Sequence, residues 1–390
     1  MAGVPEIHGF CDERFAPVRE AFANNFREFD ELGAAVAIAF EGRPVVDIWA
    51  GWADQAHTRP WEQDTLVAVF SVGKAMAALC VLMLVERGEV ELDMPVSTYW
   101  PQFSANGKGE ITVRMLLGHR AGLPAIRRLL PDAAIYDWDL MASALAEEEP
   151  WWEPGRTHGY HVNTFGFLTG ELVRRVSGES IGAFFRREVA DPLGVDFHFG
   201  LGSEHDLRTA EYVFAETSHL EGEGAGKQPR EINEERLFLL GRTYMNPPGL
   251  SGLGTVNTRA WRAAEIPSAN AHATARGVAR LYSALAGGGA VDGVRLLRAE
   301  TIDLATAEAS SGPDFVLGRP SRFGLGFQLT QPERPLGPNA RSFGHFGVGG
   351  SVGFADPDAG LAFAYAMNRF WPRWQNPRNR ALIEAAYESL

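Results

Sequence analysis

The chain has 390 residues, of which 45% are hydrophobic and 22% are charged, and its formal net charge is -13 at pH 7. This length and composition are typical of a folded protein with two packed units. The negative charge would repel phosphate groups and anionic lipids, so it disfavours nucleic acid and membrane surfaces as partners and favours a small-molecule substrate.

In chain order, the first predicted elements are a helix and a hairpin. Residues 14–29 place apolar side chains three and four positions apart, which predicts an amphipathic helix. Residues 34–40 and 44–50 are rich in valine, isoleucine and aromatic residues and flank the turn at 41–43. This pattern predicts two paired strands.

Helical patterns fill the middle of the chain. They cover residues 70–85, 141–148, 165–176, 181–189 and 273–285. The acidic, glycine-containing residues 202–228 indicate a long loop. Residues 353–355 and 361–367 flank a turn and predict a second pair of strands. An asparagine followed by a proline then predicts the start of a closing helix over residues 376–390.

Strand patterns therefore lie at both ends of the chain, and helices lie between them. This order predicts an α+β fold in which one antiparallel sheet, flanked by N-terminal and C-terminal helices, is built from residues 1–65 and 270–390. Residues 66–269 are expected to form an inserted, mainly helical domain. We expect the active site in the cleft between these two domains.

The two cysteines, Cys11 and Cys80, are far apart and predict no disulfide framework. The first residues carry no basic segment followed by an apolar block, and the longest apolar run, residues 75–85, is about half the length of a membrane span. We therefore expect a cytoplasmic protein. The sequence does not predict an oligomeric state.

Ser71 and Lys74 form a Ser-x-x-Lys pair at the start of the apolar helical pattern. Positions three apart share one face of a helix, so the lysine amine would lie beside the serine hydroxyl. Burial would lower the pKa of the lysine and let it take the serine proton, and the helix N-terminus would favour negative charge at Ser71. The alternative is a chance match, but the chain has only three lysines, and burying one without partners or a role is costly.

Four motifs in this order carry a resemblance to a known family. They are SVGK at residues 71–74, LLGHRAGLP at 116–124, PGRTHGY at 154–160 and HFG at 345–347. Together they resemble the ordered motifs of the serine β-lactamase and penicillin-binding-protein superfamily, and most of all the family VIII carboxylesterases related to class C β-lactamases. The resemblance runs from the first hairpin to the closing helix. It implies a β-lactamase-like fold, which agrees with the predicted architecture.

The resemblance also implies a serine hydrolase that forms an acyl-enzyme on Ser71, with Lys74 as the base partner. Tyr160 falls on the family's catalytic tyrosine, which passes protons between the serine, the leaving group and water. An ordinary tyrosine is a weak base at neutral pH, so either Lys74 or Tyr160 could be the general base. The backbone N–H groups of Ser71 and of Val348, expected on an edge strand, would form the oxyanion hole. No cofactor is implied.

Three departures from the family pattern bear on the substrate. Phe346 occupies the position of a hydroxyl residue that contacts the substrate carboxylate in β-lactamases and peptidases. Val162 occupies the position of an asparagine that binds the substrate amide in many relatives, and Asn163 follows one place later. His345 is a weaker cation than lysine at its position. We therefore expect short-chain, uncharged carboxylic esters as substrates. The candidates for the pocket are His345, Phe346, Gly347, Val162 and Trp152.

Other motifs have less specific interpretations. Residues 349–353 match the Gly-x-Ser-x-Gly nucleophile motif of α/β-hydrolases, but no histidine follows Ser351, so these glycines are expected to let the backbone run beside the cleft. His158 and His161 lack a third ligand at metal spacing, and we expect no metal site. Residues 252–254 are expected to form a turn.

Within the superfamily, the alternatives to an esterase are a β-lactamase, a D-amino-acid peptidase or amidase, and an acyltransferase. A catalytically inactive binding protein is the alternative that is not an enzyme. The presence of Ser71, Lys74 and Tyr160 disfavours it.

Overall fold

The structure is a computed structural model that describes residues 4–214 and 233–390. Its largest element is a nine-stranded antiparallel sheet with the strand order β1-β3-β2-β14-β13-β12-β11-β10-β9. The strands are β1 (His8–Cys11), β2 (Gly33–Phe40), β3 (Arg43–Gly51), β9 (Ser310–Pro313), β10 (Pro320–Phe323), β11 (Gln328–Leu329), β12 (Phe343–Phe346), β13 (Val352–Asp356) and β14 (Leu361–Met367). The prediction of one antiparallel sheet built from both ends of the chain is confirmed.

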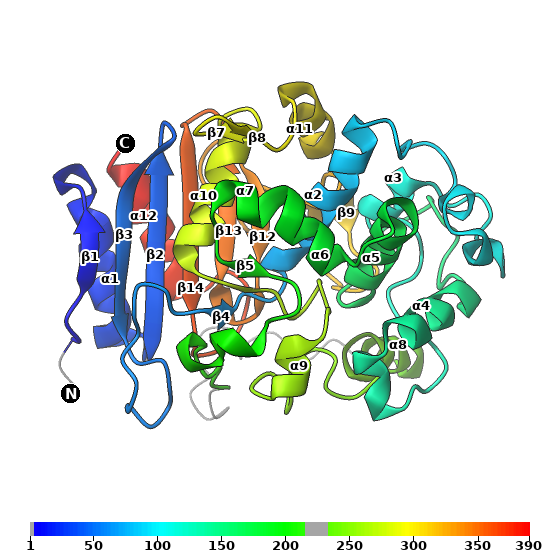
Figure 1. The fold of residues 1–390 in the computed structure, drawn as a ribbon, viewed down its shortest axis with the longest axis horizontal. Coiled ribbons are helices and arrows are strands. Elements are labelled where there is room, and N and C mark those ends of the chain that lie inside the picture. The colour runs from blue at the N-terminus through cyan, green and yellow to red at the C-terminus, as the bar shows by residue number, and fades with distance from the viewer. Residues whose placement is uncertain (1–3, 215–232) are drawn as a thin grey trace.

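Helices cover both faces of this sheet (Figure 1). α1 (Ala16–Glu28) and α12 (Pro377–Glu388) pack against each other on one face, and α10 (Ala275–Ala286) lies across β2, β13 and β14 on the other. The other helices are α2 (Val72–Glu86), α3 (Val113–Leu117), α4 (Trp138–Glu147), α5 (Thr164–Ser177), α6 (Ile181–Phe185), α7 (Asp191–Leu193), α8 (Glu234–Met245), α9 (Arg259–Ala263) and α11 (Ala299–Thr306). One smaller sheet has the strand order β4 (Val67–Ala68), β6 (His272–Ala273) and β5 (Phe197–His198). Another pairs β7 (Ala290–Val291) with β8 (Val294–Arg295).

The predicted hairpin and closing helix follow from local sequence. Between β2 and β3, Glu41 and Gly42 have φ values of 49° and 78°, the left-handed conformation that a two-residue hairpin turn needs. At the start of α12, the Asn376 side chain accepts hydrogen bonds from the backbone of Arg378 and Asn379. This cap satisfies N–H groups that the first helical turn leaves unpaired.

Two expectations about helices need correction. Ala273 pairs with β4 and β5 as part of β6, so α10 begins only at Ala275. The helix expected over residues 181–189 is α6 as far as Phe185 and then continues as the π-helical turn Arg186–Ala190. Tertiary pairing overrides the helical pattern in the first case, and a change of hydrogen-bond spacing interrupts it in the second.

The loop expected at residues 202–228 is described only in part. The 3-10 helix Ser203–Arg208 lies within it, and residues 215–228 lie outside the described part of the chain. Across residues 4–214 and 233–390, no helix combines the length and the apolar composition needed to cross a bilayer.

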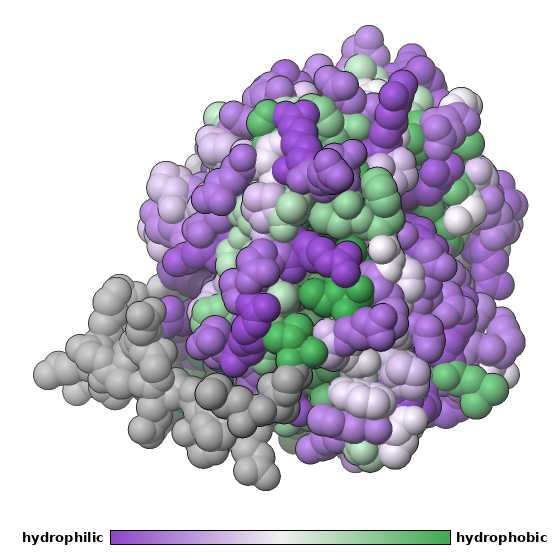
Figure 2. Space-filling view, turned by 90° about the vertical axis from the view of Figure 1, so that its left-hand side faces the viewer, coloured by the Kyte–Doolittle hydropathy of each residue, from purple (hydrophilic) through white to green (hydrophobic). Residues whose placement is uncertain are grey.

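The face on the β1 side is mostly hydrophilic, with one small group of hydrophobic residues near its middle (Figure 2). β1 is an edge strand of four residues, and Phe10 in it is 54% exposed. An edge strand of only four residues limits pairing with other chains.

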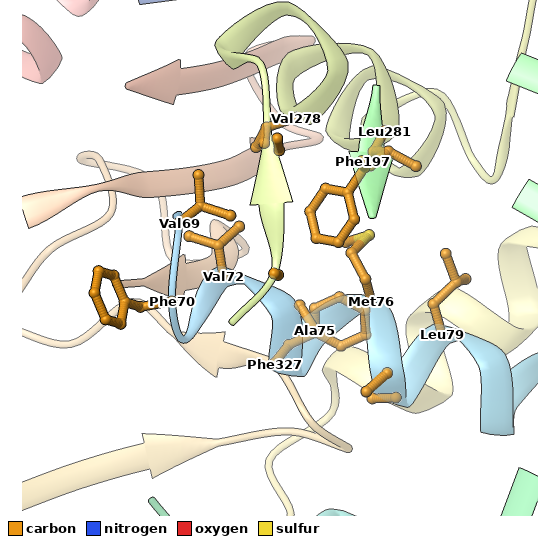
Figure 3. Packing of buried hydrophobic residues seen from close by; sticks show 14 of the residues in the cluster. Val69, Phe70, Val72, Ala75, Met76, Leu79, Phe197, Val278, Leu281 and Phe327 are labelled. Carbon is orange, nitrogen blue, oxygen red and sulfur yellow. The ribbon is translucent and has the colours of Figure 1, made fainter. Parts of the chain in front are cut away.

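The interior of the molecule is organised around α2. All its residues from Val72 to Leu84 are buried, as expected of a helix that is apolar on every side. It contacts β12 as well as α5 and α6. Figure 3 shows its side chains among those of neighbouring elements, with Met76 pointing toward Phe197. The N-terminus of α2 therefore lies where the sheet and the helices meet.

Candidate active site

Ser71 caps the N-terminus of α2 directly after a strained turn. Phe70 has a φ of 49°, a left-handed conformation that is rare for a bulky side chain. Its ring packs against Tyr212 and Trp261, with centroids 4.8 Å and 6.2 Å away, and these contacts hold the turn. Ser71 is 5% exposed, and the helix N-terminus beside it favours negative charge.

Lys74 lies one turn further along the same face of α2. Its Nζ is 2.9 Å from Ser71 Oγ and 2.9 Å from the carbonyl oxygen of Ser268. The side chain is fully buried, and this burial lowers its pKa well below 10.5. The site therefore favours a neutral amine, which has a lone pair for the Ser71 proton.

The segment that carries Ser268 is held against α2 and α5 at two glycines. A side chain at Gly73 would lie 2.4 Å from the carbonyl oxygen of Pro267, so only glycine fits there. Gly166 of α5 donates its N–H to Ser268 Oγ at 2.7 Å. The sequence gives no signal for Ser268, because its backbone carbonyl and not its side chain meets Lys74.

Tyr160 lies beside Lys74, whose Nζ is 4.8 Å from the centroid of the tyrosine ring. His119 and Phe323 flank the same ring, with centroids 5.2 Å and 5.6 Å away. The Tyr160 hydroxyl is buried and has no hydrogen-bond partner in the described part of the chain. Burial raises its pKa well above 10.0, although the nearby Ser71 hydroxyl opposes this rise. Tyr160 is thus held as a neutral phenol whose hydroxyl can bind a substrate group or water.

Gly347 lets the end of β12 approach the turn before Ser71. A side chain at Gly347 would lie 2.1 Å from Ser351 Oγ and 2.4 Å from the carbonyl oxygen of Val69. The Ser351 hydroxyl donates to the same Val69 carbonyl at 3.2 Å. Ser351 therefore ties two segments together, which supports the structural interpretation of the Gly-x-Ser-x-Gly match.

Val348 does not lie on an edge strand, so that expectation is wrong. It begins the 3-10 turn Val348–Gly350 after β12 ends, and β12 pairs with both β13 and β11. Within residues 4–214 and 233–390, neither the N–H of Val348 nor that of Ser71 donates a hydrogen bond. Both backbone donors are therefore available, as an oxyanion hole requires.

His345 is buried in β12, and its ring centroid is 5.9 Å from that of Tyr160. Its Nδ1 lies 2.7 Å from the carbonyl oxygen of Phe346, which can only accept, so Nδ1 carries the ring proton. Burial and the nearby Lys74 lower the pKa of His345 to about 3. His345 is therefore a neutral side chain with an unprotonated Nε2, and not the weak cation that was expected.

A second hydrophobic cluster gathers around the tyrosine. It consists of Tyr160, Val162, Val316 and Phe323, with Trp152, Leu317 and Trp374 packed against it. The pocket candidates Val162 and Trp152 thus lie in the cluster of Tyr160, whereas Phe346 is buried in the main core. Trp374 makes an edge contact with Tyr160 at a centroid distance of 5.2 Å. Trp374 lies in the loop between β14 and α12 and belongs to no sequence motif.

His158 and His161 use their ring nitrogens within the protein. His158 Nε2 lies 2.9 Å from Ser321 Oγ. His161 Nε2 accepts the N–H of Leu123 at 3.0 Å, and its Nδ1 donates to the Gly159 carbonyl at 2.6 Å. Among the residues that the structure describes, no three histidine, cysteine or acidic side chains are grouped as metal ligands.

Comparisons with known proteins identify the family. The model of the family described as Beta-lactamase matches residues 22–388. Esterase/beta-lactamase LipL of Mycobacterium tuberculosis is 38% identical over 370 residues, which cover 93% of this chain and 83% of LipL. The crystal structure of a family VIII carboxylesterase has a TM-score of 0.90 at 40% identity, and the match covers 99% of this chain and 100% of that one. A penicillin-binding protein homologue from Caulobacter crescentus has a TM-score of 0.88, also at 40% identity and with the same coverage. The chain therefore belongs to the beta-lactamase family and is a serine hydrolase with the β-lactamase-like fold.

Proposed function

We propose that this protein is a carboxylesterase that hydrolyses short-chain, uncharged carboxylic esters through an acyl-enzyme on Ser71. The observation that carries the proposal is the buried Lys74 amine 2.9 Å from the Ser71 hydroxyl. A serine becomes a good nucleophile when a base lies within hydrogen-bond reach, and the lowered pKa of Lys74 favours such a base. LipL is described as an esterase/beta-lactamase and the structure with a TM-score of 0.90 as a carboxylesterase, which supports an ester substrate.

In the acylation step, the Lys74 amine takes the Ser71 proton while Ser71 Oγ bonds to the carbonyl carbon of the ester. The N–H groups of Ser71 and Val348 stabilise the negative charge on the carbonyl oxygen. When the bond to the alcohol breaks, the proton passes from Lys74 to the leaving oxygen, with the Tyr160 hydroxyl as relay. Ser71 then carries the acyl group.

In the deacylation step, water attacks the acyl carbon and gives its proton to Lys74 through Tyr160. Return of this proton to Ser71 Oγ releases the carboxylic acid. Lys74 suits the role of base better than Tyr160, because burial lowers the pKa of the lysine and raises that of the tyrosine. We therefore assign the base to Lys74 and the relay to Tyr160.

Three observations support an uncharged substrate. His345 is neutral, so it offers no positive charge to a substrate carboxylate. Phe346 offers no hydroxyl. Asn163, one place after the position of the family's amide-binding asparagine, already donates to the Thr243 carbonyl and to Ser251 Oγ. A short acyl group suits the confined position of Ser71 and an apolar wall formed by the cluster around Tyr160.

We extend the proposal to the organisation of the chain. Residues 1–65 and 270–390 form the sheet domain, residues 66–269 form the helical domain, and the active site lies in the cleft between them. The pocket is lined by His345, Phe346, Gly347, Val162 and Trp152. The protein acts in the cytoplasm on a small-molecule ester, without a cofactor and without nucleic acid or a membrane as partner.

Labelling with a fluorophosphonate, followed by mass spectrometry of the modified peptide, tests the nucleophile. We expect the label on Ser71 and loss of p-nitrophenyl butyrate hydrolysis in step with labelling. A label on any other serine would overturn the assignment. Rates on p-nitrophenyl esters, a cephalosporin and a D-amino-acid amide, each with and without an alcohol acceptor, separate the esterase from the β-lactamase, the amidase and the acyltransferase.

A further inference from the structure

We propose that Asp314 is a positioning residue for Tyr160: its buried carboxylate binds the backbone N–H of Tyr160 and so holds the phenol beside Ser71 and Lys74. The inference deepens the proposed function and rests on it. Asp314 lies directly after β9, outside every motif of the sequence.

The carboxylate meets the tyrosine with both oxygens. Oδ1 and Oδ2 of Asp314 are each 3.1 Å from the backbone N of Tyr160. The two segments are joined again close by, because the N–H of Phe315, the residue after Asp314, donates to the carbonyl oxygen of His158, two residues before Tyr160, at 3.0 Å. Asp314 is 3% exposed and Tyr160 is 1% exposed, so water does not compete for these bonds. Hydrogen bonds to an ionised acceptor are the stronger kind, and a buried one limits the movement of the group that it binds.

The carboxylate is itself fixed from the opposite side. Oδ1 accepts the N–H groups of Val316 and Leu317 at 2.9 Å and 2.8 Å, and Oδ2 accepts the Ser321 hydroxyl at 2.7 Å. Because the Ser321 proton goes to Asp314, the serine oxygen accepts from His158 Nε2 at 2.9 Å. Four donors therefore converge on one buried carboxylate, and one of them is the backbone N–H of the residue that we assign as the proton relay.

The position matters because Tyr160 has few other polar restraints. Its hydroxyl has no partner in the described part of the chain, so the ring is placed by its packing and by the backbone bond to Asp314. The Asp314 charge also adds to the rise of the Tyr160 pKa that burial causes, which keeps the phenol protonated. Loss of the carboxylate would therefore displace the relay without removing it.

The test compares Asp314→Asn with Asp356→Asn. Asp356 is equally buried and also accepts two backbone N–H groups and a side-chain hydroxyl, from Asp358, Ala359 and Tyr387, but it lies at the far end of β13. For p-nitrophenyl butyrate, we expect Asp314→Asn to lower kcat by about 10- to 100-fold with KM within about threefold, since small displacements of a reacting group have effects of this size. Asp356→Asn should leave kcat per folded molecule within about threefold of the wild type.

A double-mutant cycle supplies the second readout. If Asp314 acts through Tyr160, Asp314→Asn changes kcat by less than about threefold once Tyr160→Phe is present. Additive losses, or equal losses in the two aspartate variants, would show that Asp314 only supports folding. Should Asp314→Asn fail to fold, Ser321→Ala removes a single bond to the carboxylate and is expected to lower kcat several-fold; wild-type kcat in Ser321→Ala would then reject the inference. Wild-type activity in Ser71→Ala would instead reject the proposed function itself.

Discussion

The Lys74 amine lies 2.9 Å from the Ser71 hydroxyl and at the same distance from the Ser268 carbonyl. A neutral amine that donates one hydrogen to this carbonyl can turn its lone pair toward Ser71. Lys108 is also buried, but its Nζ donates to the carbonyl oxygens of Ala105 and Glu148. Burial of a lysine therefore does not indicate a catalytic role by itself, and it is the Ser71 hydroxyl beside Lys74 that supports the proposed role.

Ser71→Ala is expected to abolish ester hydrolysis, whereas Ser351→Ala should retain most of it. Ser71 has the Lys74 amine beside it, and Ser351 only donates to the Val69 carbonyl. The measurement is kcat/KM for p-nitrophenyl butyrate, with the thermal midpoint as a check of folding. An inactive, folded Ser351→Ala together with an active Ser71→Ala would reverse the assignment.

Lys74→Met and Lys108→Met separate the two buried lysines. Lys74→Met is expected to lower kcat/KM by about 10²- to 10⁴-fold, the usual contribution of a general base, while Lys108→Met keeps the rate per folded molecule.

The stability of Lys74→Met is not expected to fall with its activity. The folded-state pKa of Lys74 is lowered, so the unfolded chain binds its proton over a range where the folded chain does not, and stability falls as pH drops through that range. Removing the amine ends this penalty, and the Tm of Lys74→Met at neutral pH should not be lower than that of the wild type. A Tm well below it would contradict a neutral buried lysine.

The sequence predicts the central strands of the sheet and the buried helix α2 because their apolar patterns are long. The strands β2, β3, β13 and β14 are five to nine residues long and mostly apolar, and α2 is buried from Val72 to Leu84. β9, β10 and β11 give no such signal. β11 has two residues and β10 begins with a proline, so pairing with neighbouring strands, and not local preference, makes them strands.

The candidate site also contains residues that the sequence predicts and residues that it does not. Ser71, Lys74 and Tyr160 belong to motifs, and the structure brings them together. Ser268 and Asp314 do not belong to motifs, because one contributes a backbone carbonyl and the other is a single carboxylate 154 positions from Tyr160. The neutral state of His345 also escapes the sequence, since it depends on burial and on the direction of the Phe346 carbonyl.

Tyr160→Phe should lower kcat by about 10²-fold or more with little change in Tm, because the lost hydroxyl relays protons and has no partner in the described structure. Tyr282→Phe is the control. The Tyr282 hydroxyl is also buried and has no hydrogen-bond partner in the described part of the chain, but the Tyr282 ring packs against Gly353 in the sheet. Tyr282→Phe is therefore expected to leave kcat unchanged. Near-normal kcat in a folded Tyr160→Phe would make Tyr160 a packing residue only.

The pH dependence of kcat/KM should follow Lys74 and no histidine. Burial lowers the pKa of His161 to about 4 and that of His345 to about 3, and it lowers the pKa of His119 as well, so these groups stay neutral at neutral pH. Activity is expected to fall as pH drops through the lowered pKa of Lys74, because the protonated amine cannot act as base. On the alkaline side, the raised pKa of Tyr160 predicts no decline up to pH 10.0. A decline that sets in well below this pH would mean that the phenol ionises in the working range. The profile is measured on p-nitrophenyl butyrate with the spontaneous hydrolysis subtracted.

The last prediction concerns substrate charge. A carboxylate that enters the site loses its water, finds the unprotonated Nε2 of His345 in place of a cation, and has no hydroxyl at Phe346. Leaving a polar group unpaired on burial costs about 1 to 3 kcal/mol, more when it is charged, and each 1.4 kcal/mol corresponds to about a tenfold change in kcat/KM. Two missing contacts therefore predict that p-nitrophenyl butyrate is cleaved at least about 100-fold more efficiently than mono-p-nitrophenyl succinate, which has a similar length and a terminal carboxylate. A chromogenic cephalosporin, which also carries a carboxylate, should be turned over slowly or not at all. Acetyl to butyryl esters should be good substrates, and octanoyl esters poor ones, because Ser71 is only 5% exposed. Equal kcat/KM values for butyrate and succinate would show that a cation reaches the acyl group, and the arginines near Trp374 would then be the first residues to replace.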